Sequence, residues 1–471
     1  MKKIFAILCA VVALSACNKA NLEPELEQNE EIQVKVKISR SDDFGTKATV
    51  KSAWAEGDVV FVFFKGIDAP KYLELKYNSG EWTGTRKNSL AASDLTGATD
   101  KKMTAIYLPY GSTAMVAASG TDFVFDGLTY NGYFLQAELV DYTFDGSELK
   151  GTLNMVAPTL TNPSDKLIHF DISGFTAGHA YDLYQDFVKP LTFTKVSADG
   201  AVTKTEGAMC KAITGYEDGT MISFSGILDA SAVGTAVDYQ FSVNDKTSSF
   251  LYTRDAGEKT ISAAKYIGIG DISNTTTWTA TEYVYLGFNN ASGQKICWAT
   301  KNLGASSSTD YGLYFPWGTT TGYADAASYP YSGESTISCE TDTDRNLLPA
   351  YDAAHVALKG LWRMPTYSEL LLLNSETTHP AFTPGNTDSG ITCTGKGEYT
   401  GASIFIPAAG HLLRNSPAYQ KESVMLYSAT RDNSNGSLAQ VLYFNSDGSR
   451  SSDYRSWPTY GRSIRPVFSI D

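Results

Sequence analysis

The sequence predicts a mainly β protein made of several domains, and three observations support this prediction. Aromatic residues make up 12% of the 471 residues and are accompanied by 40 glycines, a composition that favours strands joined by tight turns over helical bundles. Short apolar or alternating segments recur along most of the chain, with turn residues between them. The chain is also too long for one hydrophobic core, so we expect roughly two to four domains.

The clearest strands lie near the start of the predicted folded region. Residues 32–38 alternate strictly between apolar and polar side chains, which predicts a strand with one face on a core. The run from Val59 to Phe64 is apolar throughout, as in a strand that is covered on both faces. Residues 72–77 alternate again and lead through Asn78-Ser79-Gly80 into Glu81. This pattern predicts a hairpin.

A second series of short strands follows a proline-bounded segment at residues 158–163, which we take as a domain boundary. Strands at this spacing, with turn residues between them, predict β-sandwiches. The predicted strands of this series cover residues 167–172, 180–184, 191–196, 221–225, 237–243 and 260–267.

We refer to residues 282–471 as the head. Its sequence pattern differs from that of the preceding residues and contains the first convincing helices. Asp352 can cap a short helix that stops at Gly360. Thr366 and Glu369 form a capping box that opens a second helix. Short strand patterns return at residues 403–406 and 440–445. The head is therefore predicted to be an α+β domain.

The N-terminus carries the features of an exported protein. Lys2 and Lys3 precede an apolar run over residues 4–14, which is too short to span a bilayer and is typical of a secretory signal. The ending Leu14-Ser15-Ala16-Cys17 resembles the bacterial lipobox. The resemblance implies a signal peptide at residues 1–16, a diacylglycerol on Cys17, and an outer-membrane protein held by lipid, with the cell surface as its expected location. An ordinary signal peptide with a chance cysteine is the alternative.

The residues after Cys17 are expected to tether the folded part. Residues 17–31 are polar and acidic and have no apolar period, which is typical of a flexible segment. The chain carries a formal charge of −13, and loss of Lys2 and Lys3 with the signal would make it −15. This balance argues against nucleic acid and against an anionic membrane surface as partners. The lipid is then the expected contact with the membrane.

Four motifs between residues 31 and 270 appear in a suggestive order: Gly45-Thr46-Lys47-Ala48, Trp54-Ala55-Glu56-Gly57-Asp58, Tyr107-Leu108-Pro109-Tyr110-Gly111 and Gly151-Thr152-Leu153-Asn154-Met155. In this order they resemble the fimbrillin family of bacterial surface lipoproteins. The resemblance implies two transthyretin-like β-sandwiches, at residues 32–160 and 161–275, and a role in pili or surface adhesion with fimbrial subunits as partners. It also implies that a lipidated leader is cut after an arginine. Arg40, the first arginine of the chain, is the candidate position.

The head carries a second set of ordered motifs, among them Trp298-Ala299-Thr300-Lys301-Asn302-Leu303-Gly304-Ala305, Trp362-Arg363-Met364-Pro365-Thr366 and Gly461-Arg462-Ser463-Ile464-Arg465-Pro466-Val467. They resemble the Fibrobacter succinogenes major paralogous domain family, and the resemblance implies a C-type-lectin-like fold. The complete expectation is two transthyretin-like β-sandwiches followed by an α+β C-type-lectin-like domain. A fold of this kind does not fix a ligand.

Aromatic residues in polar loops of the head are the candidate ligand-binding residues. Exposed rings beside hydrogen-bonding loops are suited to stacking on the apolar face of a sugar, whereas Trp298 and Trp362 are expected in the core. The alternative for each candidate is that its ring pins a long loop onto the domain. The candidates are Tyr323, Tyr329, Tyr331, Tyr454, Trp457 and Tyr460.

No metal site is predicted in the head. The calcium-binding motifs of lectins are absent, and the sequence Asp342-Thr343-Asp344-Arg345-Asn346 lacks the glycine and glutamate of an EF-hand loop. We therefore expect a solvated turn that leads to the Asp352 cap.

The sequence offers no support for an enzyme or a cofactor. GxSxG, P-loop, GxGxxG and HExxH motifs are all missing. Cys297, Cys339 and Cys393 could mimic the reactive cysteines of formylglycine-generating relatives, but a structural role is the preferred alternative. With Cys210, these cysteines allow three pairings that the sequence does not distinguish. Because three of them fall in the last third, we expect one disulfide there, with Cys210 buried and free.

Taken together, these features indicate a cell-surface lipoprotein that acts in adhesion. It would be a fimbrial accessory or tip subunit whose lectin-like head meets a glycan or a surface protein. The alternative is a surface lipoprotein that captures or processes glycans and has no connection with pili.

Overall fold

The computed structural model describes residues 33–41, 54–67, 71–87, 89–108, 115–119, 122–125, 130–131, 134–197, 201–207, 213–214, 216–218, 221–261, 266–273, 277–414, 416–450 and 455–471. The predicted signal peptide, the predicted tether with Cys17, and the residues Cys210 and Tyr454 lie outside these ranges. In the part of the chain that is described, no helix is long and apolar enough to cross a membrane.

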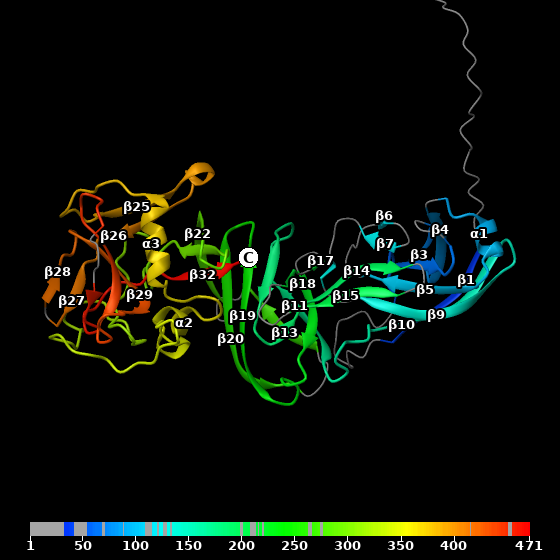
Figure 1. Ribbon diagram of the computed structural model, residues 1–471, viewed down its shortest axis with the longest axis horizontal. Coiled ribbons are helices and arrows are strands. Elements are labelled where there is room, and N and C mark those ends of the chain that lie inside the picture. The colour runs from blue at the N-terminus through cyan, green and yellow to red at the C-terminus, as the bar shows by residue number, and fades with distance from the viewer. Residues whose placement is uncertain are drawn as a thin grey trace, which may run out of the picture.

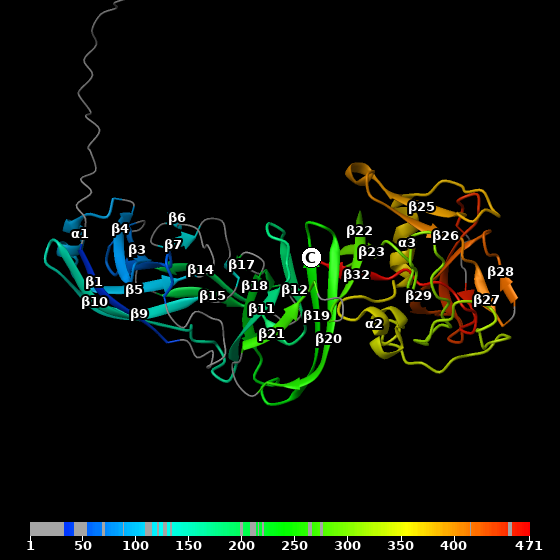
Figure 2. The ribbon, with the colours of Figure 1, turned by 180° about the vertical axis from the view of Figure 1, so that it is seen from behind.

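The described residues form a mainly β protein with few helices, as predicted, and its lobes follow one another along the longest axis (Figure 1). β1 (Gln33–Ser41) belongs to the lobe at one end, whereas β27 (His411–Leu413) and β28 (Ser416–Ala418) lie at the other end. The view from behind shows the same order (Figure 2). In both views the C-terminus lies near the middle of the molecule.

Among the described residues, seven strands of the N-terminal lobe form one curled sheet. β1 runs parallel to β10, and every other neighbouring pair is antiparallel. β4 closes on β1, because a Cβ atom on Gly84 would lie 2.5 Å from a side-chain carbon of Val34. The short helix α1 (Ala92–Gly97) precedes β5. The sheet order is β1, β10 (Glu148–Val156), β9 (Leu135–Phe144), β5 (Lys102–Tyr107), β2 (Val59–Phe64), β3 (Tyr72–Asn78) and β4 (Glu81–Lys87).

Strand β2 is covered on both faces, as its unbroken apolar sequence predicts. Val60, Val62 and Phe64 belong to the core of the curled sheet. Phe61 and Phe63 point the other way, into a second core that includes Phe193. The hairpin after β3 is also confirmed: Ser79 and Gly80 both have positive φ, as the tight turns that match strand twist require.

The second core lies against a sheet that draws on both predicted sandwiches. β14 (Leu191–Ser197) pairs with β15 (Val202–Glu206) on one side and with β7 (Asp122–Phe125) and β8 (Tyr130–Asn131) on the other. β6 (Met115–Ser119) pairs with β7. Strand pairing therefore crosses the predicted boundary at residue 160.

The central lobe packs a smaller sheet onto β12 (Tyr181–Tyr184), β19 (Ala236–Asp245) and β20 (Phe250–Thr260), with Phe170 and Phe241 in the shared core. The smaller sheet has the order β13 (Val188–Lys189), β18 (Met221–Leu228), β11 (Lys166–Ser173) and β21 (Tyr266–Asp271), and β17 (Tyr216–Asp218) also pairs with β18.

The predicted strand at residues 260–267 is wrong in its bounds. Thr260 ends β20, which pairs with β19, whereas Tyr266 begins β21, which pairs with β11. The apolar signal in this segment therefore came from the end of one strand and the start of another in a different sheet.

The sheet of the central lobe continues into the head. β22 (Thr279–Asn289) pairs with β20 at its start and with β23 (Lys295–Ala299) further along, and β32 (Val467–Ile470) pairs with β23. In the described residues the order is β16 (Ile213–Thr214), β12, β19, β20, β22, β23 and β32. The chain's last strand is thus part of the joint between central lobe and head.

A turn of the head closes the same joint from the other side. The backbone N–H of Leu361 donates to Ser242 Oγ at 2.9 Å, and Thr253 Oγ1 donates to the carbonyl of Leu358. Gly360 has a positive φ, and any side chain there would collide with Ser242. Tyr283, Trp362 and Phe468 form the apolar centre of the joint.

The rest of the head combines short strands with the predicted helices. Asp352 caps α2 (Ala353–Leu358), and the Thr366–Glu369 capping box opens α3 (Tyr367–Ser375), as predicted. Trp298 and Trp362 are both buried, again as predicted. The remaining elements are η1 (Pro349–Tyr351), η2 (Gly397–Tyr399), β24 (Thr377–Thr378), β25 (Gly390–Gly395), β26 (Ser403–Pro407), β29 (Val424–Arg431), β30 (Ala439–Phe444) and β31 (Arg455–Ser456).

Candidate functional site

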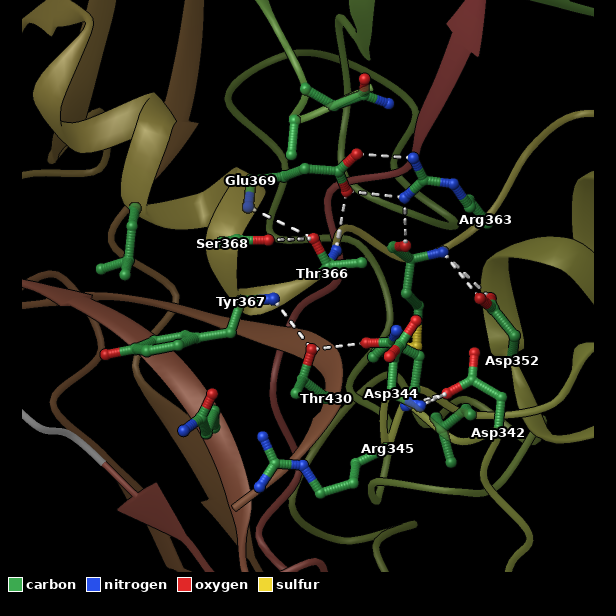
Figure 3. Close-up of a pocket in the computed structure, with 18 of the residues that line it drawn as sticks. Asp342, Asp344, Arg345, Asp352, Arg363, Thr366, Tyr367, Ser368, Glu369 and Thr430 are labelled. Atoms are coloured by element: carbon green, nitrogen blue, oxygen red, sulfur yellow. Dashed lines mark hydrogen bonds and ion pairs between the residues drawn. The ribbon is translucent and has the colours of Figure 1, made fainter. Parts of the chain in front are cut away.

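A polar pocket of about 810 Å³ opens on the head (Figure 3). Its walls are the turn at residues 342–347, the β22–β23 turn at 290–292, and the segment 363–369 that leads into α3. Ala429, Thr430 and Gln440 of β29 and β30 complete the lining. We refer to this cavity as the head pocket.

One wall is a side-chain-stabilised turn, as the sequence predicts. Asp342 Oδ1 accepts hydrogen bonds from the backbone N–H of Asp344 at 2.9 Å and of Asn346 at 2.8 Å. Arg345 lies between them with φ near 68°, and this exposed residue lines the pocket. The side chain of Asn346 links this turn to β29, because its Oδ1 accepts a hydrogen bond of 2.7 Å from Thr430 Oγ1.

The opposite wall is the start of α3, which is held by an ion pair between the half-buried Arg363 and the buried Glu369. Arg363 donates to both carboxylate oxygens of Glu369, at 2.6 and 2.7 Å. Burial disfavours the charged form of Glu369, but the hydrogen bonds and charge of Arg363 outweigh burial and hold the pKa of Glu369 below its ordinary value. The carboxylate also accepts from the backbone N–H of Thr366 at 2.8 Å. These bonds tie Arg363 and the start of α3 together through Glu369.

A further carboxyl group supports the base of the pocket. Asp352 accepts hydrogen bonds from the backbone N–H groups of His355, at 3.0 Å, and of Met364, at 2.9 Å. Burial raises the pKa of Asp352. Asp352 thus ties α2 to the strand-like segment that leads into α3.

The head pocket is not arranged to hold a metal ion. Among the described residues, no group of three or more His, Cys, Asp or Glu side chains could bind one. One oxygen of Asp342 is already occupied by two backbone N–H groups. The turn itself and the Asp352 cap that follows it are both present, as expected.

Three of the predicted aromatic residues come together at the far end of the head. Tyr323 and Tyr331 flank Tyr329, with ring centroids 5.3 and 5.8 Å from it. Tyr329 is fully buried and its hydroxyl donates to the carbonyl of Thr459 at 2.8 Å. Tyr329 therefore has no exposed face to offer a ligand and fastens its loop to the domain, whereas Tyr323 and Tyr331 are half-buried.

Trp457 and Tyr460 are both half-buried, and Tyr460 follows Thr459, whose carbonyl accepts the hydrogen bond of Tyr329. The ring of Tyr460 stacks on His411 with a centroid distance of 5.1 Å, and its hydroxyl donates to Glu334 Oε1 at 3.1 Å. The remaining predicted residue, Tyr454, lies outside the described residues.

Sequence reasoning missed several residues of these surfaces. Tyr419 is 50% exposed and its ring lies 5.7 Å from that of His411. The pairing of β27 with β28 brings these two residues together. Tyr367 in the head pocket was read only as part of a helix cap. Local periodicity carries no signal for either arrangement.

Arg40, the predicted cleavage position, lies near the end of β1. Its guanidinium lies over the rings of Trp54 and Tyr107, 5.1 and 5.4 Å from their centroids. The residue is half-buried.

The expected disulfide in the last third is wrong. Cys297, Cys339 and Cys393 are all free thiols. Burial raises the pKa of Cys297 and of Cys393 to about 12. Thiols that stay protonated are poor nucleophiles, so both behave as small core residues.

No protein-family model and no curated protein matches the sequence. Similar solved structures include a fimbrial protein from Bacteroides ovatus, with 12% identity over 94% of this chain and 99% of that one and a TM-score of 0.22. A candidate cell adhesion protein from Bacteroides uniformis has 15% identity over 54% and 97% and a TM-score of 0.26. The fimbrial anchor protein Mfa2 from Porphyromonas gingivalis has 9% identity over 45% and 78% and a TM-score of 0.20. TM-scores this low assign neither a fold family nor a function to this chain.

Proposed function

We propose that this protein is a cell-surface lipoprotein that acts in adhesion, with Cys17 as its lipid attachment site and a lectin-like head as its binding part. One observation above all supports the proposal: β1, which follows the predicted tether, and the loop-rich end of the head lie in opposite end lobes of the molecule (Figure 1). A chain attached through its N-terminus would therefore hold the head away from the membrane.

The proposal includes two transthyretin-like sandwiches as the stalk and a fimbrial accessory or tip role. β1 is an edge strand of the curled sheet, with Val36 buried in the core and Val34 and Ile38 packed against it. Cleavage after Arg40 followed by loss of β1 would uncover the part of the core that these residues cover, together with the edge of β10 that pairs with β1. An exposed edge of this kind accepts a strand from a partner.

The position of the last strand, β32, favours a subunit at the end of a fimbrial fibre. β32 is hydrogen-bonded to β23, and Phe468 is fully buried between Tyr283 and Trp362, with ring centroids 4.9 Å from each. Donating this strand to a neighbour would break the joint of the head. The subunit would accept a strand from a neighbouring subunit at the edge of β10 but would not donate its own β32.

A glycan-capture lipoprotein without pili is the second candidate, and the head pocket favours it. The pocket is formed entirely by the head and needs no second subunit. Polymer formation separates the two candidates, because only a fimbrial subunit exchanges strands with a partner.

The proposal is tested in cells that carry the full chain or its Cys17→Ala variant. We expect wild-type protein in the outer-membrane fraction, open to protease added outside the cell, and cells that bind host or bacterial surface material. The variant should leave the membrane fraction and lose cell-borne adhesion. Unchanged membrane retention of the variant would overturn the lipoprotein assignment, and adhesion equal to that of cells lacking the protein would overturn the adhesive role.

A further inference from the structure

We propose that the head pocket binds a neutral glycan directly, without calcium, using Asp344 and Arg345 at its rim and the ring of Tyr367 as a stacking surface. This inference rests on the proposed adhesive function and names its ligand class. The site is separate from the aromatic cluster that the sequence predicts.

The pocket has the size and rigidity of a binding site. Its volume of about 810 Å³ lies within the roughly 300–1,000 Å³ typical of small-ligand sites. Both walls are held by internal hydrogen bonds, those of Asp342 on one side and those of Glu369 with Arg363 on the other. A ligand would therefore meet a preformed surface, which lowers the entropy lost on binding.

Two charged side chains at the rim, those of Asp344 and Arg345, are available to a ligand. Within the described part of the chain, neither Asp344 nor Arg345 makes a side-chain hydrogen bond or ion pair, and both are exposed. Asp344 can only accept hydrogen bonds, whereas Arg345 can only donate them. A sugar hydroxyl does both, so adjacent hydroxyls of one ring can satisfy this pair together.

Tyr367 supplies the apolar component. Its backbone N–H donates to Thr430 Oγ1 at 2.9 Å, which fixes the residue at the start of α3. Figure 3 shows its ring on one side of the pocket, across from the turn that carries Asp342 and Asp344. An aromatic ring at this position can stack on the C–H face of a sugar while the rim groups bind its hydroxyls.

The charges of the pocket disfavour an anionic glycan. Its lining contains the carboxyl groups of Asp342, Asp344, Asp352 and Glu369 but only the guanidiniums of Arg345 and Arg363. Arg363 is already paired with Glu369. The whole chain is acidic as well, with a formal charge of −13. Sialylated or sulfated sugars would approach against this field.

The test uses the purified full chain, because β22 and β32 join the head to the central lobe. The chain is screened on an array of neutral hexose-terminated oligosaccharides and their sialylated forms, and the best ligand is titrated with and without EDTA. We expect a neutral ligand with Kd between about 1 μM and 1 mM, and no change on chelation. Preference for sialylated forms, or loss of binding with EDTA, would overturn the proposal.

Substitutions locate the site. Asp344→Asn and Arg345→Asn change exposed rim residues, and asparagine tolerates the positive φ of Arg345. Each should weaken binding about tenfold, as expected for one or two lost hydrogen bonds. Tyr419→Ala, which removes an exposed ring outside the head pocket, serves as the control and should leave Kd unchanged.

The outcomes separate this inference from the proposed function. If Tyr419→Ala weakens binding and the rim variants do not, the glycan site lies at the aromatic end of the head and not in the head pocket. If no glycan binds while cells carrying the protein still adhere, the adhesive function stands and the ligand class is wrong. Binding that a cationic peptide competes away would also overturn the neutral-glycan assignment.

Discussion

The guanidinium of Arg40 lies over the indole of Trp54, with 5.1 Å between Arg40 Cζ and the ring centroid. Trp54 Nε1 in turn donates to the carbonyl of Ile38 at 3.1 Å. One tryptophan therefore holds both the side chain of the predicted cleavage position and the backbone just before it. A protease that reads arginine must first displace this residue from the ring.

This contact predicts slow cleavage of the folded protein. An arginine-specific protease should cut after Arg40 more slowly in the native chain than in the unfolded chain. Trp54→Leu should speed native cleavage by about 2- to 30-fold, the range that corresponds to a cation–π contact of 0.5 to 2 kcal/mol. Mass spectrometry of timed digests measures the rate. Trp82→Leu, which alters a neighbouring ring, is the control, and equal rates for the two variants would contradict the role of Trp54.

The joint of the head predicts a large effect from one residue near the C-terminus. Phe468 is fully buried against Tyr283 and Trp362, and truncating a buried phenylalanine costs about 3–5 kcal/mol. Phe468→Ala should lower the unfolding free energy of head and central lobe together, because β20 and β22 form one sheet. Urea denaturation measures it, with Asp471→Asn at the exposed terminus as the control. A variant as stable as wild type would show that the joint adds little.

The position of β32 predicts that the protein does not polymerise by itself. After protease treatment, the purified chain should remain monomeric by size-exclusion chromatography and give no ladder on denaturing gels. A strand donated by a second kind of subunit should still bind. Homopolymeric ladders would show that β32, or another strand, can leave its place and join a neighbour.

Local sequence patterns correctly predicted those strands, turns and helix caps that are determined by neighbouring residues. The apolar run of β2, the turn at Ser79 and Gly80, and the caps at Asp352 and Thr366 each depend on a few neighbouring residues. Burial of Trp362 followed from its size and its motif.

The same local patterns could not predict which strands pair when they lie far apart in the sequence. Nothing local to β14 shows that it pairs with β7, some 70 residues earlier, and nothing in β22 reveals that it extends the sheet of β20. The head pocket was missed for the same reason, because Asp344, Tyr367 and Gln440 meet only through the fold. A disulfide was expected from the number of cysteines, but the fold buries Cys297 and Cys393 as separate free thiols.

Trp362 and Trp457 of the head predict opposite outcomes on truncation. Trp362 has no exposed surface, so Trp362→Ala should destabilise the head by about 3–5 kcal/mol and abolish its cooperative unfolding. Trp457 is half-buried, so Trp457→Ala should leave the fold intact. Near-ultraviolet circular dichroism and denaturation curves of both variants measure this. Similar losses in the two would mean that Trp457 also supports the core.

His411 predicts a specific dependence of stability on pH. Burial, together with the charge of Arg462, lowers the pKa of His411 to about 4, and no hydrogen bond reaches its Nδ1 within the described residues. The unfolded chain takes up this proton at pH values near 6.5, where the folded chain does not. The folded state is therefore penalised as pH falls from about 6.5 to about 4, by up to about 3 kcal/mol, and the penalty is absent above this window.

The variant His411→Gln removes the titrating group while keeping a planar polar side chain. Other groups also titrate as pH falls, so the informative quantity is the difference in unfolding free energy between variant and wild type at each pH. That difference should move in favour of the variant as pH is lowered from 7 to 4. In the wild type, the unfolded chain binds a proton at His411 in this range and the folded chain does not, so the unfolded state is stabilised; the variant has no such proton to bind. Urea denaturation at several pH values measures it. A difference that stays constant across the window would show that His411 is solvated or protonated in the folded head.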